Sequence, residues 1–186
     1  SVFGMGYVGV VAGACLAKEG HDIVGIDVNP VKVDLLRQGL SPIVEEGIAE
    51  LVRETVASGR LRATAATAEA VAATDLSLVC VGTPSAENGS LSLAAMDSAS
   101  GEIGDALRAK RGPHTVVYRS TILPGTTEER LVPILERRSG RKVGEDLFVG
   151  YNPEFLREGT SIRDFHEPPM TVVGSRDEQV YRQMEA

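Results

Sequence analysis

The amino-acid sequence predicts an α/β fold: a doubly wound, mostly parallel sheet with helices on both faces. Short apolar segments alternate with segments of helical periodicity, which is typical of parallel strands joined by helical crossovers. Residues 76–81 form a continuous apolar run, as expected for a strand covered on both faces. A glycine-rich turn, Gly4-x-Gly6-x-x-Gly9, separates the first apolar segment from the first helical one.

The spacing of the three glycines predicts a dinucleotide-binding turn of the Rossmann type; the alternative is a plain strand–turn–helix. Gly4 permits a tight turn out of the strand, Gly6 lets the backbone approach a pyrophosphate, and Gly9 lets the helix pack close to the strand. The following helix would direct its unpaired N–H groups and the positive end of its dipole at the phosphates.

Asp27 strengthens this interpretation. It ends a second predicted strand, residues 21–27, and lies 18 positions after Gly9. A carboxylate at about this spacing binds the adenine ribose hydroxyls. It would also repel a 2′-phosphate, so the sequence favours NAD over NADP.

The remaining elements follow from local signals. Asn29-Pro30 predicts a helix start, because Asn caps helices and Pro suits the first helical position, and Gly39 predicts the end of that helix. Thr126 is the candidate cap of a later helix. The predicted strands cover residues 1–3, 21–27, 61–63, 76–81, 115–118, 147–149 and 170–174. The predicted helices cover residues 8–19, 30–37, 48–58, 66–73, 94–110, the segment after 126, and 178–186.

Three loops follow predicted strands, at residues 82–85, 119–125 and 152–158. The carboxyl ends of parallel strands meet at one edge of a sheet, where ligands bind, so we expect these loops beside the glycine turn. Thr83 would offer a hydroxyl to the dinucleotide, or simply end its strand. Thr121 would place a hydroxyl near the nicotinamide or a bound water, which makes it a candidate catalytic residue, or it would belong to a polar turn.

Glu154 and Glu158 lie four residues apart, and in a helical turn they would share one face. One interpretation is that they are exposed acids paired with Arg157 or Arg163. The other is that a carboxylate beside the nicotinamide acts as a general base or orients a water molecule.

Composition narrows the class of protein. The chain of 186 residues has a net charge of −7 and a pI near 5.0, which argues against nucleic-acid or anionic-membrane partners. No apolar run approaches a membrane span, and no secretory signal is present, so we expect a cytoplasmic protein.

Cys15 and Cys80 fall in apolar runs and are expected to be buried and inert. The three histidines are isolated, so no metal site is expected.

Four motifs in order, F-G-M-G-Y-V-G, V-G-T-P-S, R-S-T-I-L-P-G-T and N-P-E-F-L-R-E, resemble the UDP-glucose/GDP-mannose dehydrogenase family over nearly the whole chain. Four further segments are most similar to the members that oxidise GDP-mannose in the alginate pathway. These segments are S-P-I-V-E, the N-G after G-T-P-S, H-T-V-V-Y-R-S-T and P-P-M-T-V-V-G.

The resemblance implies oxidation of a sugar C6 alcohol to a carboxylate with two NAD+ per turnover, through an aldehyde and a cysteine thioester. It also implies roles for individual residues. Glu154 would act on water or at the thioester step, and Glu158 would contact the nucleotide sugar. The implied NAD contacts are the glycine turn with Tyr7 and Val8 at the pyrophosphate, Asp27 and Lys32 at the adenosine ribose, and Thr83 and Thr121 at the nicotinamide.

The family's nucleophilic cysteine lies in a Gly-Gly-x-Cys loop that this sequence does not contain, and neither Cys15 nor Cys80 occupies such a motif. We therefore expect residues 1–186 to be the N-terminal NAD-binding domain, able to bind NAD but not to turn over. The central helix and the C-terminal substrate domain would be absent, and the full-length protein would be a homo-oligomer. The alternatives are a member that oxidises UDP-glucose or a UDP-aminosugar, and a non-catalytic NAD-sensing module.

Overall fold

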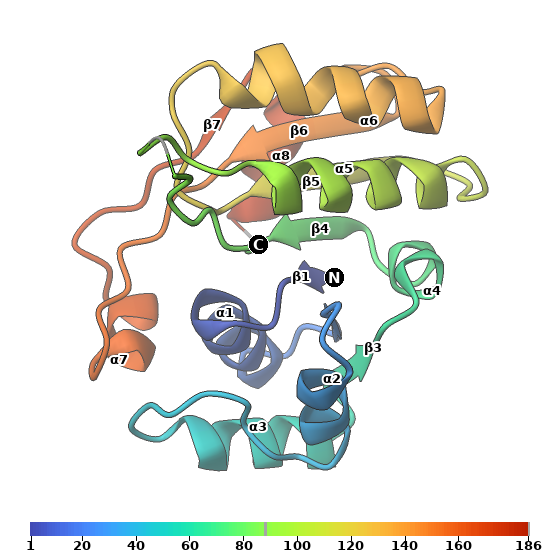
Figure 1. Cartoon of the computed structure of the whole chain (residues 1–186). Coiled ribbons are helices and arrows are strands. Elements are labelled where there is room, and N and C mark those ends of the chain that lie inside the picture. The colour runs from blue at the N-terminus through green and yellow to red at the C-terminus, as the bar shows by residue number, and fades with distance from the viewer. Residues whose placement is uncertain (88, 186) are drawn as a thin grey trace.

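The computed structural model describes residues 1–87 and 89–185, and its centre is one seven-stranded sheet in the order β3-β2-β1-β4-β5-β6-β7 (Figure 1). The first six strands are parallel, and β7 runs antiparallel to β6. The strand order reverses direction between β1 and β4, which creates the crevice where ligands of such sheets bind. The strands are β1 Val2–Phe3, β2 Ile23–Ile26, β3 Leu61–Thr64, β4 Leu76–Val79, β5 His114–Tyr118, β6 Leu147–Tyr151 and β7 Gly174–Ser175.

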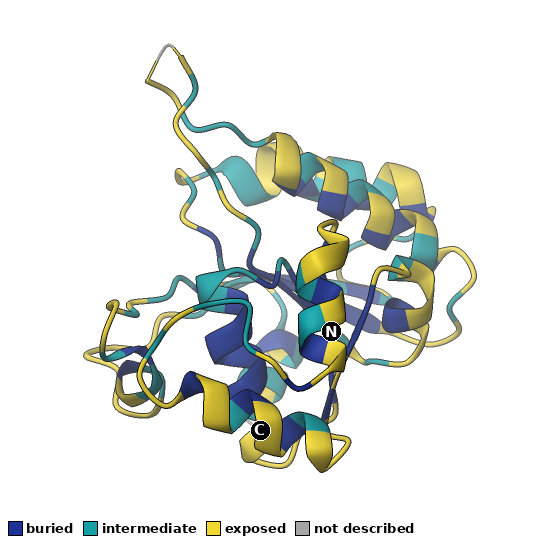
Figure 2. Cartoon of the chain, turned by 60° about the horizontal axis from the view of Figure 1, so that its bottom comes forward, coloured by how far each residue is buried: buried dark blue, intermediate teal, exposed yellow. Residues whose placement is uncertain are grey.

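Helices cover both faces, which confirms the predicted doubly wound fold. One buried cluster joins the sheet to α1, α2, α3 and α8, and a second joins it to α4, α5 and α6. Figure 2 shows the consequence, because the helices are buried on their inner sides and exposed on their outer sides. The helices are α1 Tyr7–Lys18, α2 Pro30–Arg37, α3 Ile48–Ala57, α4 Thr67–Ala72, α5 Ala94–Leu107, the π-helical turn η1 Thr127–Leu131, α6 Val132–Ser139, α7 Ser161–His166 and α8 Glu178–Met184.

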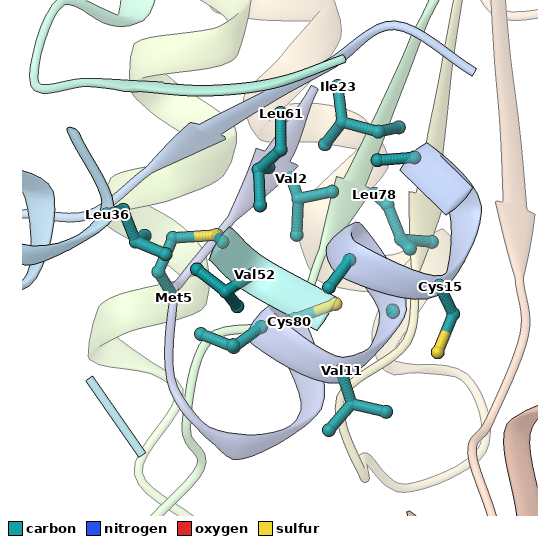
Figure 3. Packing of buried hydrophobic residues seen from close by; sticks show 14 of the residues in the cluster. Val2, Met5, Val11, Cys15, Ile23, Leu36, Val52, Leu61, Leu78 and Cys80 are labelled. Carbon is teal, nitrogen blue, oxygen red and sulfur yellow. The ribbon is translucent and has the colours of Figure 1, made fainter. Parts of the chain in front are cut away.

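The core under α1 fixes the position of the glycine turn. Met5, inside the turn, is fully buried. Figure 3 shows its side chain next to Leu36 of α2 and Val52 of α3, in the same cluster as Val2 of β1. Apolar packing of Met5 therefore anchors the turn, and its glycines lie at the carboxyl-terminal edge of the parallel strands.

Local signals predicted the start of α2 correctly. The Asn29 side chain accepts a hydrogen bond from the N–H of Val31 at 3.0 Å, and Pro30 is the first helical residue. Gly39 follows the end of α2 with φ +72°, a conformation that favours glycine.

Three predictions of secondary structure were wrong or incomplete. Thr126 has helical backbone angles and makes no side-chain cap, so it is not the predicted N-cap. The π-helical turn η1 follows it. The next turn contains Pro133, which has no N–H to donate to the carbonyl of Glu129. The strand predicted at residues 170–174 is limited to Gly174–Ser175, and the carbonyl of Val172 accepts from the Asn152 side chain instead of a neighbouring strand. Helix α7 was not predicted. The predicted last residue of the terminal helix, Ala186, and Asn88 in the loop after β4 lie outside the described residues.

Candidate functional site

The glycine turn leads from β1 into α1, and each glycine meets a different environment. Gly4 has φ +90°, and a Cβ there would lie 3.0 Å from the backbone of Cys80. A Cβ on Gly9 would lie 2.0 Å from the carbonyl oxygen of Gly4, so this glycine is required for the helix to approach the strand. A Cβ on Gly6 would meet no protein atom within 4 Å. The backbone at Gly6 therefore faces open space.

The N-terminus of α1 is suited to an anion. Gly6 is the N-cap and offers no side chain, so the first N–H groups of the helix have no intrahelical partner. The first turn contains no acidic residue, and the helix dipole places partial positive charge there. The backbone N–H groups that follow Gly6, including those of Tyr7 and Val8, therefore fit a pyrophosphate. The Val8 side chain packs on the core, so this residue can contribute only its backbone to a ligand above the turn.

Asp27 lies at the end of β2 and has a structural role that sequence reasoning did not assign. Its carboxylate is buried and accepts hydrogen bonds from the N–H groups of Met5 at 2.8 Å and Asn29 at 2.9 Å. Lys32 donates to the same carboxylate at 3.2 Å, so the predicted pair is brought together. Asp27 thus connects the glycine turn to the start of α2.

The loops after β4 and β5 are joined to each other. Thr83 Oγ1 donates to the carbonyl oxygen of Thr121 at 2.9 Å, and Ser120 Oγ donates to that of Val81 at 2.6 Å. Because β1, β4, β5 and β6 are adjacent in this order and parallel, the loops after β4, β5 and β6 begin at the same carboxyl-terminal edge of the sheet as the glycine turn. The predicted convergence of strand ends is therefore confirmed.

The relation predicted between Glu154 and Glu158 is wrong. Residues 152–157 are irregular and 158–160 form a turn, so the two carboxylates do not share a helical face. Glu154 accepts from the N–H of Leu156 at 2.6 Å, and Glu158 is exposed. Arg157, the predicted partner of these acids, pairs instead with Asp164 of α7 at 2.7 Å.

Arg119 and Asn152 were not identified from the sequence, yet they link the ends of β5 and β6. The guanidinium of Arg119 donates to the Asn152 side chain, which in turn donates to the carbonyl of Val172 at 2.8 Å. Burial lowers the pKa of Arg119, and its Nε has no hydrogen-bond partner among the described residues. Both residues line a cavity of about 820 Å³ on the α1 side of the sheet, as does Glu154. A basic residue directly after a buried strand was the available signal for this site.

The environment of the two cysteines makes their thiols unreactive. Cys15 lies in α1, and Cys80 is the first residue after β4; both are buried and free. Burial raises the pKa of each thiol to about 12, so neither forms the thiolate a nucleophile needs near neutral pH. Within residues 1–87 and 89–185, no three His, Cys, Asp or Glu side chains are arranged to hold a metal ion. Over the same part of the chain, no helix combines the length and apolarity needed to cross a bilayer.

The chain is similar in sequence to GDP-mannose 6-dehydrogenases. It is 54% identical over 177 residues to that enzyme of Pseudomonas syringae pv. tomato, matching 95% of this chain and 40% of the relative. The enzyme of Azotobacter vinelandii is 52% identical over 184 residues, with 99% of this chain and 42% of the relative covered. The chain thus spans about two fifths of the length of these relatives.

Solved structures give the same result. A ternary complex of GDP-mannose dehydrogenase from Pseudomonas aeruginosa superimposes with a TM-score of 0.97 at 48% identity, covering 99% of this chain and 42% of that one. A UDP-glucose dehydrogenase from Pyrobaculum islandicum superimposes with a TM-score of 0.93 at 42% identity, covering 98% and 42%. Residues 1–186 match the NAD binding domain of the UDP-glucose/GDP-mannose dehydrogenase family, and the chain belongs to that family.

Proposed function

We propose that this chain is the NAD-binding domain of a nucleotide-sugar 6-dehydrogenase that oxidises GDP-mannose to GDP-mannuronate. The observation that supports cofactor binding best is the open space at Gly6, directly in front of the uncapped N-terminus of α1. GDP-mannose is favoured as the substrate because the relatives named GDP-mannose 6-dehydrogenase reach 54% identity, against 42% for a UDP-glucose 6-dehydrogenase of Haloferax volcanii.

The proposed cofactor contacts follow from where each residue lies. Backbone groups of the glycine turn, Gly4, Gly6 and Gly9 with Tyr7 and Val8, hold the pyrophosphate. Bound NAD+ supplies the hydride acceptor. The contacts proposed for its other parts are Asp27 and Lys32 at the adenosine ribose, and Thr83 and Thr121 at the nicotinamide end.

Substrate-side roles are proposed for two acids in the segment between β6 and α7. Glu154 would accept a proton from water, and it is supported in this role by its place beside the buried Arg119 in the large cavity. Glu158, exposed in the turn before α7, would contact the nucleotide sugar.

We also propose the chemical steps of the oxidation. Two successive oxidations would convert the C6 alcohol to a carboxylate through a thioester on a cysteine outside residues 1–186. Since Cys15 and Cys80 are buried with raised thiol pKa values, this chain would bind the dinucleotide without turning over. The full-length protein would be a cytoplasmic homo-oligomer.

Calorimetric titration with NAD+ and NADP+ tests the cofactor assignment. We expect NAD+ to bind and NADP+ to bind more weakly, because the Asp27 carboxylate opposes a 2′-phosphate. Absence of NAD+ binding would overturn the proposal.

Substrate profiling of the full-length protein that contains this domain tests the reaction. We expect reduction of NAD+ with GDP-mannose; preference for UDP-glucose would support the runner-up substrate. NAD+ binding with no oxidation of either sugar nucleotide would support a non-catalytic NAD-sensing module. Substantial turnover by residues 1–186 alone would contradict the proposed location of the nucleophile.

A further inference from the structure

Glu45 joins three segments that are distant in the sequence. Its carboxylate accepts the Tyr7 hydroxyl at 2.6 Å, the Gly159 N–H at 2.8 Å and the Ser161 N–H at 3.1 Å. Tyr7 belongs to the first turn of α1, Glu45 to the loop before α3, and Gly159 and Ser161 to the start of α7. Figure 1 shows α1, α7 and the loop before α3 at the same end of the molecule. We call this set of contacts the Glu45 clamp.

The acceptor of the clamp is a charged carboxylate. The hydrogen bonds from Tyr7 and Gly159 hold the pKa of Glu45 below its ordinary value, so the carboxylate is charged near neutral pH. Hydrogen bonds to a charged acceptor are worth more than neutral ones. The N-cap residue of α7, Thr160, makes no side-chain cap. Glu45 therefore satisfies N–H groups at the start of a short helix that has no cap of its own.

The loop that contains Glu45 is itself fixed. Ser41 Oγ donates to the carbonyl of Ile43 at 2.8 Å and accepts from the N–H of the same residue at 3.2 Å. The Ile43 side chain packs on the core under α1. Both the main chain and a side chain of this loop are therefore held two residues before Glu45, at the point where the loop contacts the start of α7.

The segment it holds contains the two acids proposed to face the substrate. Residues 152–160 have no regular secondary structure, and Asn152 anchors their first end through Val172. At the other end the Tyr7 hydroxyl lies 3.2 Å from the carbonyl oxygen of Arg157, in addition to its bond with Glu45. Glu154 lies between Asn152 and Arg157, and Glu158 lies between Arg157 and Gly159, whose N–H donates to Glu45. The position of the acids therefore depends on a side chain that belongs to the glycine turn.

We propose that Glu45 is a positioning residue that couples occupancy of the glycine turn to the placement of the segment with Glu154 and Glu158. A dinucleotide held by the backbone of the turn would fix Tyr7, and the Tyr7 hydroxyl would transmit this order through Glu45 to residues 157–161. The identity of the ligand rests on the proposed function, whereas the clamp is a property of the free chain. Coupling of this kind is reciprocal, so loss of the clamp must also weaken dinucleotide binding.

Hydrogen exchange measured on the whole chain, with and without saturating NAD+, tests the coupling. Glu45→Gln keeps the side-chain volume but replaces one acceptor oxygen by a donor. In the free protein we expect it to speed exchange at the Gly159 and Ser161 amides about tenfold, because a bond to a charged acceptor is lost. Tyr7→Phe keeps the bonds to those two amides and removes only the link to the glycine turn. Glu46→Gln, at the exposed neighbouring position, is the matched control.

In the wild type and in Glu46→Gln, we expect NAD+ to slow exchange at Gly159 and Ser161. In Tyr7→Phe, exchange without NAD+ should stay near the wild-type rate, and the slowing by NAD+ should be lost. Equal slowing by NAD+ in the wild type and in Tyr7→Phe would overturn the coupling and leave Glu45 a purely structural cap. Unchanged exchange in Glu45→Gln without NAD+ would overturn the clamp itself. Failure of the wild type to bind NAD+ in calorimetry would count against the proposed function, while the experiments without ligand would still test the clamp.

Discussion

The contrast between Gly6 and Gly9 gives the sharpest test of the glycine turn. Both are replaced by alanine, which adds one methyl group in each case. At position 6 this group enters the open space in front of α1, whereas at position 9 it would lie 2.0 Å from the Gly4 carbonyl oxygen. The same chemical change should therefore weaken NAD+ binding at position 6 and lower the stability of the fold at position 9.

The magnitudes follow from the contact distances. A phosphate oxygen bonded to a backbone N–H lies about 2.9 Å from the nitrogen, and a methyl group on Gly6 would displace it by roughly 1 Å. Loss of about two charge-assisted hydrogen bonds costs roughly 3 kcal/mol, which raises the Kd for NAD+ about a hundredfold. The free energy of unfolding of Gly6→Ala should change by no more than about 1 kcal/mol. Gly9→Ala must push α1 away from β1, which we expect to cost about 3 kcal/mol of stability.

Two measurements check this contrast. Calorimetry gives the Kd for NAD+, and urea denaturation gives the free energy of unfolding of both variants. If Gly6→Ala binds NAD+ as tightly as the wild type, the pyrophosphate does not approach Gly6 and the assignment of the site is refuted. If Gly9→Ala is as stable as the wild type, the close approach of helix and strand has been misjudged.

Three further predictions concern buried groups. Asp27→Ala should weaken NAD+ binding and lower stability, because two backbone N–H groups lose their acceptor; an unchanged Kd in calorimetry would remove Asp27 from the site. Cys15 and Cys80, with thiol pKa values raised to about 12 by burial, should react with a thiol reagent at pH 8 only after denaturation, and fast labelling of the folded chain would contradict this. Hydrogen bonding from Arg157 lowers the pKa of Asp164 below its ordinary value of 3.8, so its contribution to stability is present above about pH 4 and is lost as the pH falls further. Thermal melts of Asp164→Asn should accordingly show a weaker pH dependence between about pH 5 and 3 than the wild type, and an equal dependence would count against this role.

The parts of the fold that depend on neighbouring residues could be predicted from the sequence. The cap at Asn29 and the conformation of Gly39 are set within a few residues, and alternating apolar segments gave the parallel sheet. The segment with Glu154 and Glu158 could not be predicted. Its conformation is decided by the contacts of Asn152 and Asp164 with residues 20 and 7 positions away, which override the helical spacing of the two acids.

The site shows the same division between near and distant contacts. The glycine spacing locates the turn, but the hydrogen bonds from Tyr7 to Glu45 and from Gly159 to Glu45 join residues 38 and 114 positions apart. No local pattern encodes such pairs. The structural role of Asp27 could not be predicted for the same reason, because its hydrogen bond from the Met5 N–H spans 22 positions.

The hydrogen bond from the Met5 N–H to the Asp27 carboxylate limits how the cofactor preference of this domain can be redesigned. A variant intended to accept NADP must remove the negative charge at position 27, and that carboxylate is also the buried acceptor that holds the turn. Alanine would remove both functions together. Asparagine removes the charge and retains one oxygen that can accept from Met5, so it is the better starting point for engineering. Lys32, released from its ion pair, would then supply a cation for the additional phosphate.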